Sequence, residues 1–304
     1  MQFSGLNQLG FMSRGLSAPI KEMQLPSAGL HDEFPASLAA RAASDSTVAH
    51  VPAATRAMAL LDLLAQTREA MNVTRLASRL ELPKSSVHSL CNTLAARGYL
   101  RRQAEGAYFI GPAVMNLAHA FVAQTSAVQE FSSLWRELGA PPEDTVILSL
   151  LDGNEVVYVA ARHGDRPLGL SFAMGMRLPA HLAASGKAML AYRDEAAVRV
   201  LYPTGQLPAY RGVPAQSLAS LSEEFALIRE RGWSVDDEGI REGVFCFGAP
   251  VFDESGLPAA GIGVCVNKAI LKPELEQHNR DLVSRIGAQL TQRLGGARPE
   301  GLRR

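Results

Sequence analysis

The chain has 304 residues, of which 47% are hydrophobic and 20% are charged, and its formal net charge is zero. This length and composition are typical of a soluble globular protein of about two domains. No run of about 18 apolar residues is present, and the N-terminus lacks the charged and apolar regions of a signal peptide. We therefore expect a cytoplasmic protein that has no membrane partner.

The three cysteines, Cys91, Cys246 and Cys265, are far apart in the sequence and lack CxxC or Cys/His ligand spacing. A disulfide framework or a structural zinc site is therefore not expected. We interpret the cysteines as buried, reduced thiols. No metal and no cofactor are expected.

The positive charge is concentrated in one part of the chain. Residues 1–50 carry Ser, Ala, Gly and Pro without a sustained apolar period, which predicts a disordered arm. Residues 52–111 hold eight Lys and Arg against four acidic residues, whereas the residues after them hold a slight excess of acids. This distribution is a modest electrostatic footprint for DNA binding.

Residues 51–111 are predicted to form three helices and a hairpin. Apolar spacing and β-prone runs place the helices at about 53–66, 74–80 and 83–97 and the strands at 99–102 and 107–110. Thr74 is the expected N-cap of the second helix, Pro83 opens the third, and Gly98 ends it. Helix, helix, turn, helix and hairpin is the order of a winged helix-turn-helix domain.

The outward face of the third predicted helix carries short polar or cationic side chains, which suit a DNA groove. They are Lys84, Ser85, Ser86, His88, Ser89 and Asn92. Thr74 joins them as a DNA-binding candidate. Arg101 and Arg102 on the hairpin are expected to contact the phosphate backbone. The alternative for each arginine is a solvated charge on a strand, and for His88 a plain surface residue.

The second half of the chain predicts an α+β fold with an antiparallel sheet. A linker helix is expected at 112–138, within a linker segment 112–140. It precedes an effector-binding domain at 141–296 and a tail at 297–304. Strands are expected at 145–151, 156–161, 244–252 and 258–266, and helices at 181–192, 194–201, 217–231 and 273–294.

Several motifs in both halves occur in a specific order and spacing. They are LPKSSVH (82–88), LAARGYL (94–100), EGAYFIG (105–111), GMRLP (175–179), SGKAMLA (185–191), RGWSVDDE (231–238) and GVFCFGAPVFD (243–253). Together they resemble the isocitrate lyase regulator (IclR) family of bacterial transcription factors, over about residues 52–294.

The resemblance implies a winged helix-turn-helix joined to a GAF-like effector domain. It also implies a homodimer or homotetramer on an operator in double-stranded DNA, where effector binding changes promoter occupancy and so controls a catabolic operon. A dimer is physically reasonable, because one winged helix touches few base pairs and two coupled recognition helices supply specificity.

The effector site is expected near the start of the helix that follows residue 181. The backbone amides of Ala184, Ser185 and Gly186 are candidates for an anion site. The resemblance implies that Asp236 and Cys246 line the same pocket, and that Gly263 and Cys265 stand where the family often has serines. An apolar wall is expected from Met174, Met176 and Leu178.

The expected effector is a small organic acid, aromatic or otherwise bulkier than a two- or three-carbon acid. Gly263 and Cys265 remove hydroxyl donors and leave room, and the amides of 184–186 offset the cost of burying a carboxylate. Asp236 beside an anion must share a proton or bind a hydroxyl group of the ligand, which favours a hydroxy acid.

Two catalytic interpretations of the sequence are not favoured, so no catalytic residue is expected. Ser185-Gly186-Lys187 lacks the upstream glycine and the following Ser/Thr of a phosphate-binding loop. Ser185, His181 and Asp236 lack the GxSxG elbow of a hydrolase. The alternative function is a metabolite-binding enzyme or sensor whose N-terminal helical domain only dimerises.

Overall fold

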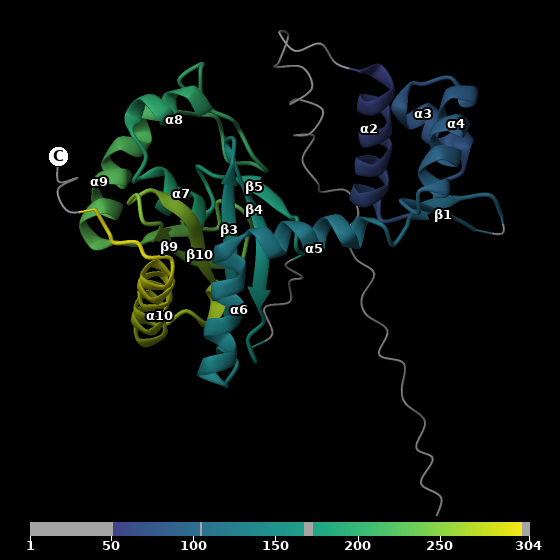
Figure 1. Cartoon of the computed structure of the whole chain (residues 1–304). Helices are drawn as coiled ribbons and strands as arrows, with labels where there is room; N and C mark the ends of the chain where they lie inside the picture. The colour runs from purple at the N-terminus through teal and green to yellow at the C-terminus, as the bar shows by residue number, and fades with distance from the viewer. Residues whose placement is uncertain (1–50, 104, 167–172, 300–304) are drawn as a thin grey trace, which may run out of the picture.

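The computed structural model describes residues 51–103, 105–166 and 173–299 (Figure 1). The predicted arm at 1–50 and the end of the predicted tail, 300–304, lie outside these residues. Two groups of elements are joined by one helix, α5: helices α2 to α4 with a hairpin, and a sheet covered by helices (Figure 1). The predicted α+β class is confirmed. No helix in the described ranges is both long and apolar enough to cross a membrane.

The N-terminal group follows the predicted order. Its elements are α2 (Pro52–Thr67), α3 (Val73–Leu80), α4 (Lys84–Ala96), β1 (Leu100–Arg102) and β2 (Tyr108–Ile110). Leu60, Leu76, Val87 and Tyr108 come from four different elements and are at most 1% exposed in a common core. Each element therefore contributes an inward apolar side to one small domain.

The predicted cap of α3 is wrong. The cap is Asn72, whose side-chain oxygen accepts a hydrogen bond of 2.9 Å from the backbone N–H of Arg75, and Thr74 is the second residue of the helix. Both types are good N-caps, so composition alone does not choose between them. Pro83 is likewise the cap of α4 rather than its first residue.

The predicted single linker helix is two helices, α5 (Val114–Gln124) and α6 (Ser126–Leu138). Between them Thr125 adopts an extended backbone, with φ −104° and ψ 96°. Its hydroxyl donates to the carbonyl of Phe121 at 2.8 Å, which satisfies a carbonyl at the end of α5. Apolar residues recur on both sides of Thr125, so periodicity alone does not reveal the break.

The second group is built on one antiparallel sheet of six strands, in the order β5-β4-β3-β10-β9-β8. The strands are β3 (Thr145–Asp152), β4 (Glu155–Arg162), β5 (Arg177–Pro179), β8 (Ser234–Asp237), β9 (Val244–Phe252) and β10 (Pro258–Asn267). The predicted β3–β4 hairpin turns at Gly153, whose φ of +63° suits a residue without a Cβ.

Different helices cover the two faces of the sheet. Helices α6 and α10 (Pro273–Arg293) pack on one face through Phe131, Ile286 and Leu290. Helix α7 (Ala184–Leu190) packs on the other face, together with α8 (Glu195–Leu201) and α9 (Leu221–Arg231). The candidate effector residues lie on the α7 face.

Strands β5 and β8 were not predicted. In β8 the inward residues Ser234 and Asp236 are both buried and polar, so the strand lacks the apolar alternation that marks a half-buried strand. A two-stranded ribbon of β6 (Gln206–Leu207) and β7 (Gln216–Ser217) and the 3-10 turns Leu218–Ser220 and Lys268–Ile270 complete the described elements.

Glycines allow α7 to lie very close to the sheet. A Cβ on Gly248 would stand 2.3 Å from the carbonyl carbon of Ala184, and one on Gly261 would stand 2.8 Å from the carbonyl oxygen of Ser185. Both contacts involve the backbone of α7, which cannot move aside like the end of a flexible side chain. Gly248 and Gly261 therefore determine how closely this helix packs on the sheet.

We predict that Gly248→Ala destabilises the protein by about 1–3 kcal/mol, the usual cost of overpacking a filled interior. Gly263→Ala is the matched control, because its Cβ would meet nothing nearer than the Phe247 carbonyl oxygen at 4.0 Å. Urea denaturation of both variants measures the difference. Equal losses of unfolding free energy in the two variants would show that the packing of α7 on the sheet does not depend on Gly248.

Candidate functional site

The outward face of α4 carries most of the residues predicted to meet DNA. Lys84, Ser85, His88, Ser89 and Asn92 are exposed, whereas Ser86 is half-buried. The sequence placed Ser86 on the outward face, and this placement is only partly correct. Helical spacing puts Ser85, His88, Ser89 and Asn92 on one side, because residues three and four apart are neighbours.

Asn92 is tied to the hairpin. Its side-chain oxygen accepts a hydrogen bond of 3.2 Å from the hydroxyl of the buried Tyr108, and its amide nitrogen lies 3.3 Å from Nδ1 of His88. Asn92 therefore fixes the angle between α4 and β2 and orients His88. The sequence did not indicate this structural role.

The two candidate hairpin arginines lie side by side on β1. Arg101 and Arg102 are both exposed, and Cζ of Arg102 lies 5.8 Å from the centre of the Tyr108 ring. Among the described residues neither arginine forms an ion pair, so both keep their charge available to a partner. The polar face of α4 and this arginine pair form the candidate nucleic-acid interface.

Sheet register brings three of the predicted effector residues into one row. Asp236 of β8 lies opposite Cys246 of β9, which lies opposite Cys265 of β10, and the row ends at Thr145 of β3. Residues directly opposite in an antiparallel sheet share a face, so all four side chains point towards the α7 side. Cys246 and Cys265, far apart in the sequence, have their sulfur atoms 2.9 Å apart, and both are reduced.

Little of the described part of the chain lies above Gly263, beside this row. Gly263 pairs with Gly248, and both belong to the α7 face, but only Gly248 is covered by α7. Among the described residues, a Cβ on Gly263 would meet only the Phe247 carbonyl oxygen, at 4.0 Å. We call the region bounded by Gly263, Asp236, Cys246, Cys265 and the start of α7 the effector cavity.

Asp236 is 4% exposed, and its electrostatics differ from those of a surface acid. Burial raises the pKa of Asp236 to about 6, against the opposing effects of Lys187 and of the backbone N–H groups of Gly239 and Ile240. The Gly239 N–H donates to the carboxylate at 2.8 Å. Near neutral pH a small change in surroundings is therefore enough to protonate this side chain.

The pKa values of one thiol and of a nearby phenol are raised as well. The hydrogen bond to Cys265, together with burial, raises the pKa of the Cys246 thiol well above its usual value. Burial, followed by the charges of Cys265, Cys246 and Asp236, raises the pKa of Tyr158 on β4. The sequence analysis did not identify Tyr158 as a site residue. Its position in a predicted strand, within EVVYVAAR, indicated only that it could face the core.

Helix α7 begins three residues after the predicted start at 181, so the amides of 184–186 lie in its first turn. The helix begins at Ala184, its preceding residue Ala183 has an extended backbone, and no side chain caps it. Its first N–H groups have no acceptor within the helix, as at any helix start. The Ser185 hydroxyl accepts a hydrogen bond of 2.8 Å from the hydroxyl of the buried Ser149. The Ser185 amide, in the first turn of α7, has no acceptor within the helix.

The predicted apolar wall is only partly assembled. Leu178 is buried in the core on the α7 face, and Met176 packs against that core. Met174 is 74% exposed and lines a different hollow, shared with Phe121 of α5. Met174 therefore does not belong to the predicted wall. It lies in the exposed turn that precedes β5.

The side chains behind the two rejected catalytic interpretations have other partners. Nζ of Lys187 forms an ion pair of 2.6 Å with Glu224. His181 packs edge-on against Tyr202, with ring centres 5.9 Å apart, and the Ser185 hydroxyl meets Ser149 instead of a histidine. In the described ranges no three His, Cys, Asp or Glu side chains are grouped as a metal site would require.

Comparison with known families agrees with both halves of this arrangement. Residues 53–104 match the IclR helix-turn-helix domain, and residues 119–291 match the C-terminal domain of the bacterial transcriptional regulator IclR. The chain belongs to the IclR family. It is a DNA-binding transcriptional regulator of the IclR type, and the alternative in which the N-terminal domain serves only to dimerise is not supported.

Individual relatives extend over most of the chain. The transcriptional repressor IclR of Escherichia coli is 32% identical over 223 residues, covering 70% of this chain and 79% of that protein. The Agobacterium tumefaciens repressor BlcR is 34% identical, with a TM-score of 0.51, over 84% of this chain and all of that one. An IclR homologue from Microbacterium hydrocarbonoxydans, solved with 4-hydroxybenzoate, shares the fold at 16% identity and a TM-score of 0.64, over 79% and 97% of the two chains.

We predict that Asp236→Asn stabilises the protein near neutral pH relative to acid pH. A carboxyl group whose folded pKa is raised from 3.8 to about 6 favours folding fully below pH 4 and loses that contribution as pH rises through 6. The loss amounts to about 3 kcal/mol. Asparagine stays neutral and keeps an oxygen for the Gly239 N–H.

Urea denaturation at pH 4.5 and 7.5 measures this effect. The difference in unfolding free energy between the variant and the native chain should grow at the higher pH, and Asp281→Asn, at an exposed position on α10, should show no such growth. A difference independent of pH would contradict the raised pKa of Asp236.

Proposed function

We propose that this regulator controls a catabolic operon in response to a small organic acid. The acid binds in the effector cavity and changes the affinity of the protein for operator DNA. The observation that carries the proposal is one buried row of polar groups, Asp236, Cys246 and Cys265, beside the space at Gly263. The proposed domains are 51–111 for DNA binding, 112–140 as linker, and 141–296 for the effector. The protein is proposed to act in the cytoplasm and to have no catalytic activity.

An aromatic acid or a hydroxy acid is the proposed effector. The raised pKa values of the Cys246 thiol and of Tyr158 keep both groups protonated, so they can act as hydrogen-bond donors, and the amides of 184–186 are donors as well. A cavity rich in donors suits a carboxylate, whose burial is costly without them. The Microbacterium homologue holds 4-hydroxybenzoate, an aromatic hydroxy acid, which agrees with this class of ligand.

Asp236 is proposed to bind a hydroxyl group of the effector or to donate a proton to its acid group. Its pKa of about 6 makes both forms accessible near neutral pH. A second anion in the cavity favours the protonated form, because like charges at short distance oppose each other's ionisation. The effector is therefore proposed to bind more tightly as pH falls towards 6.

The regulator is proposed to assemble as a homodimer or homotetramer through α2 and α5. Met58 on α2 is 61% exposed, and Met115, Leu117 and Phe121 on α5 are 65%, 59% and 49% exposed. Several large apolar side chains facing water on α5 and α2 are unusual for a monomer. A second copy of the chain would cover it and pair two recognition helices.

On DNA, α4 is proposed to enter the major groove. Ser85, His88 and Ser89 are proposed to meet base edges, Lys84 and Thr74 to meet phosphates, and Arg101 and Arg102 to follow the backbone as wing contacts. Ser86 and Asn92 contribute from the edge of the face, since Ser86 is half-buried and Asn92 is bound to Tyr108.

We expect benzoate, hydroxybenzoates or hydroxy acids to raise the melting temperature of the full chain, and neutral amides of the same shape to leave it unchanged. A ligand that binds only the folded state stabilises it by mass action. The acid that stabilises the protein should also change its affinity for operator DNA in a mobility-shift titration. Stabilisation by the neutral amides alone would remove the assignment of an acid effector.

Gly263→Val should abolish this stabilisation while the protein still folds, because the new side chain fills the open space without meeting the backbone of α7. Gly256→Val is not a suitable control, because Gly256 has a φ of +76°, which valine adopts only with strain. Ala259→Val, at a half-buried position two residues before Gly261 that lines a hollow beside α6, serves instead. An unchanged ligand response in Gly263→Val would place the effector elsewhere.

We expect His88→Ala or Ser89→Ala to reduce the discrimination between operator and random DNA more than Arg102→Ala does. Base contacts distinguish sequences, whereas a phosphate contact adds affinity to all of them. Arg102→Ala should weaken binding to both DNAs alike and lower the salt slope by about one unit. Titrations at two or more salt concentrations, with an operator selected from random duplexes, measure both quantities.

The opposite pattern, in which Arg102→Ala relaxes sequence preference and the α4 variants do not, would move the recognition surface to the hairpin. Asn92→Ala requires a stability measurement beside the binding measurement. It leaves the buried Tyr108 hydroxyl without its acceptor, which costs about 1–3 kcal/mol of folding free energy.

A further inference from the structure

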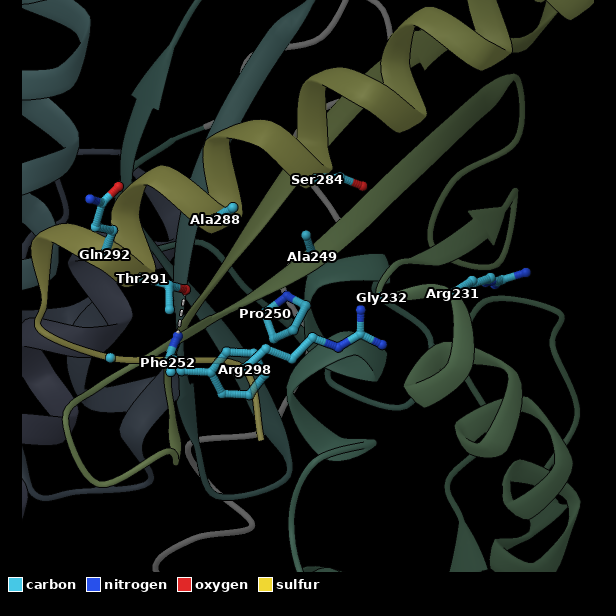
Figure 2. A pocket seen from close by; sticks show the side chains of 12 residues that line it. Arg231, Gly232, Ala249, Pro250, Phe252, Ser284, Ala288, Thr291, Gln292 and Arg298 are labelled. Atoms are coloured by element: carbon cyan, nitrogen blue, oxygen red, sulfur yellow. Dashed lines mark hydrogen bonds between the residues drawn. The ribbon is translucent and has the colours of Figure 1, made fainter. Parts of the chain in front are cut away.

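A hollow of about 440 Å³ lies at an edge of the sheet, between α10, the end of α9 and the last residues of β9 (Figure 2). Strand β8 pairs with β9 only over 245–248, so residues 249–252 continue past the end of β8. The hollow occupies the place that a longer β8 would fill. It is therefore a consequence of strand length and not of a missing side chain.

The floor of the hollow is apolar and one wall is polar. Ala249, Pro250 and Phe252 form the floor along β9, while Ser284, Thr291 and Gln292 project from α10 (Figure 2). The Thr291 hydroxyl accepts the N–H of Phe252 at 3.0 Å, and Pro250 has no N–H. Neither Pro250 nor Phe252 therefore has a backbone N–H that needs an acceptor from a further strand. None of the described residues that line the hollow is acidic.

Two arginines stand at the open side. Nε of Arg231 donates to the carbonyl of Trp233 at 2.6 Å, and its Cζ lies 3.8 Å from the centre of the Trp233 ring. Arg298 comes from the chain beyond α10, and one of its terminal nitrogens donates to the carbonyls of Arg229 and Glu230 at the end of α9. A cation is favourable there, because the carbonyl end of a helix carries partial negative charge.

The fold makes room for Arg298. Gly232, which ends α9 with a φ of +88°, lies directly under its guanidinium, and a Cβ at this position would stand 2.7 Å from Nη1. In Figure 2 the guanidinium of Arg298 lies beside Gly232, whereas the Arg231 side chain points away from Arg298. The position of Arg298 is therefore fixed by the chain around it and not only by its own rotamer.

Within the described ranges neither Arg231 nor Arg298 forms an ion pair with a carboxylate. The Arg231 guanidinium is stacked on Trp233, which does not line the hollow, whereas Arg298 gives one nitrogen to backbone carbonyls, also meets Tyr192 and keeps further N–H donors. A guanidinium held beside an apolar floor, with no acid among the described lining residues, forms a site that a negatively charged ligand would complete. We propose that this hollow binds a small organic anion with an apolar body, whose charged group meets Arg298.

The site is separate from the effector cavity. Cys246 and Phe252 lie six residues apart on β9, a distance of about 20 Å along an extended strand. The volume of about 440 Å³ suits a ligand of one ring or a short chain. A carboxylate and a phosphate ester share the chemistry that guanidinium groups recognise, so the test uses both.

Calorimetric titration of the full chain tests the proposal with benzoate, phenyl phosphate and the neutral benzamide. Because benzoate also suits the effector cavity, the titration uses Gly263→Val, in which that cavity is filled, beside the native chain. We expect saturable binding of benzoate or phenyl phosphate in the Gly263→Val chain and none of benzamide. Trp233 fluorescence should change with the same saturation curve, since its ring stacks on Arg231.

Two further variants, made in the Gly263→Val chain, locate the site. Arg298→Gln should weaken binding about tenfold or more, and Arg298→Lys, which keeps the charge, should weaken it less. Ala288→Tyr fills the hollow from an exposed position of α10 and should abolish binding without touching either arginine. Arg285→Gln, at an exposed position elsewhere on α10, should leave the affinity unchanged.

Several results would overturn the proposal. They are the absence of binding by both anions, equal binding of benzamide, and an affinity that neither Arg298→Gln nor Ala288→Tyr lowers. Binding that Gly263→Val abolishes belongs to the effector cavity, which would support the proposed function and refute this second site. A change of oligomeric state in Ala288→Tyr would show that another copy of the chain covers the hollow.

Discussion

The close contact between α7 and two glycines of the sheet determines the geometry of the effector side of this regulator. Gly248 and Gly261 carry no Cβ, so the backbone of Ala184 and Ser185 lies directly on β9 and β10. Ser234 strengthens this contact, because its hydroxyl donates to the carbonyl of Ala184 at 2.5 Å. The first amides of α7 are thereby held at a fixed height above the strands.

The effector cavity follows from this arrangement. Gly263 lies in the same row as Gly248 but beyond the reach of α7, so the missing side chain there leaves space instead of a contact. The neighbouring row supplies Asp236, Cys246 and Cys265 to one wall. A filled interior tolerates few voids, and a space beside buried polar groups is therefore a feature that the surrounding structure must maintain.

Sequence patterns predicted the parts of the fold whose apolar residues recur regularly. The three helices and the hairpin of the N-terminal domain, the β3–β4 hairpin, strands β9 and β10 and helix α10 all have such patterns. Strand β8 has polar inward residues, Ser234 and Asp236, because it serves the cavity, and for that reason its pattern is not that of a strand. The cap at Asn72 and the break at Thr125 could not be predicted, because neighbouring residues have similar propensities. Only the folded structure shows which residue takes the role.

The candidate sites were predictable to different degrees. The polar face of α4 follows from helical spacing alone, whereas the meeting of Asp236, Cys246 and Cys265 depends on the strand register and on a resemblance to known regulators. Tyr158 and the arginine-flanked hollow were missed. Tyr158 joins the cavity through pairing with Ser149 on β3, and Arg298 reaches α9 from a segment without any sequence period.

The break at Thr125 gives α5 the properties of a lever. Helix α5 has 11 residues, which corresponds to a length of about 16 Å at about 1.5 Å per residue. A rotation of about 20° at one end of such an arm moves the other end by about 6 Å, more than the rise of about 3.4 Å per base pair along the axis of the DNA helix. A small change in two backbone torsions at a single residue is thus geometrically sufficient to shift a DNA-binding domain out of register with its site.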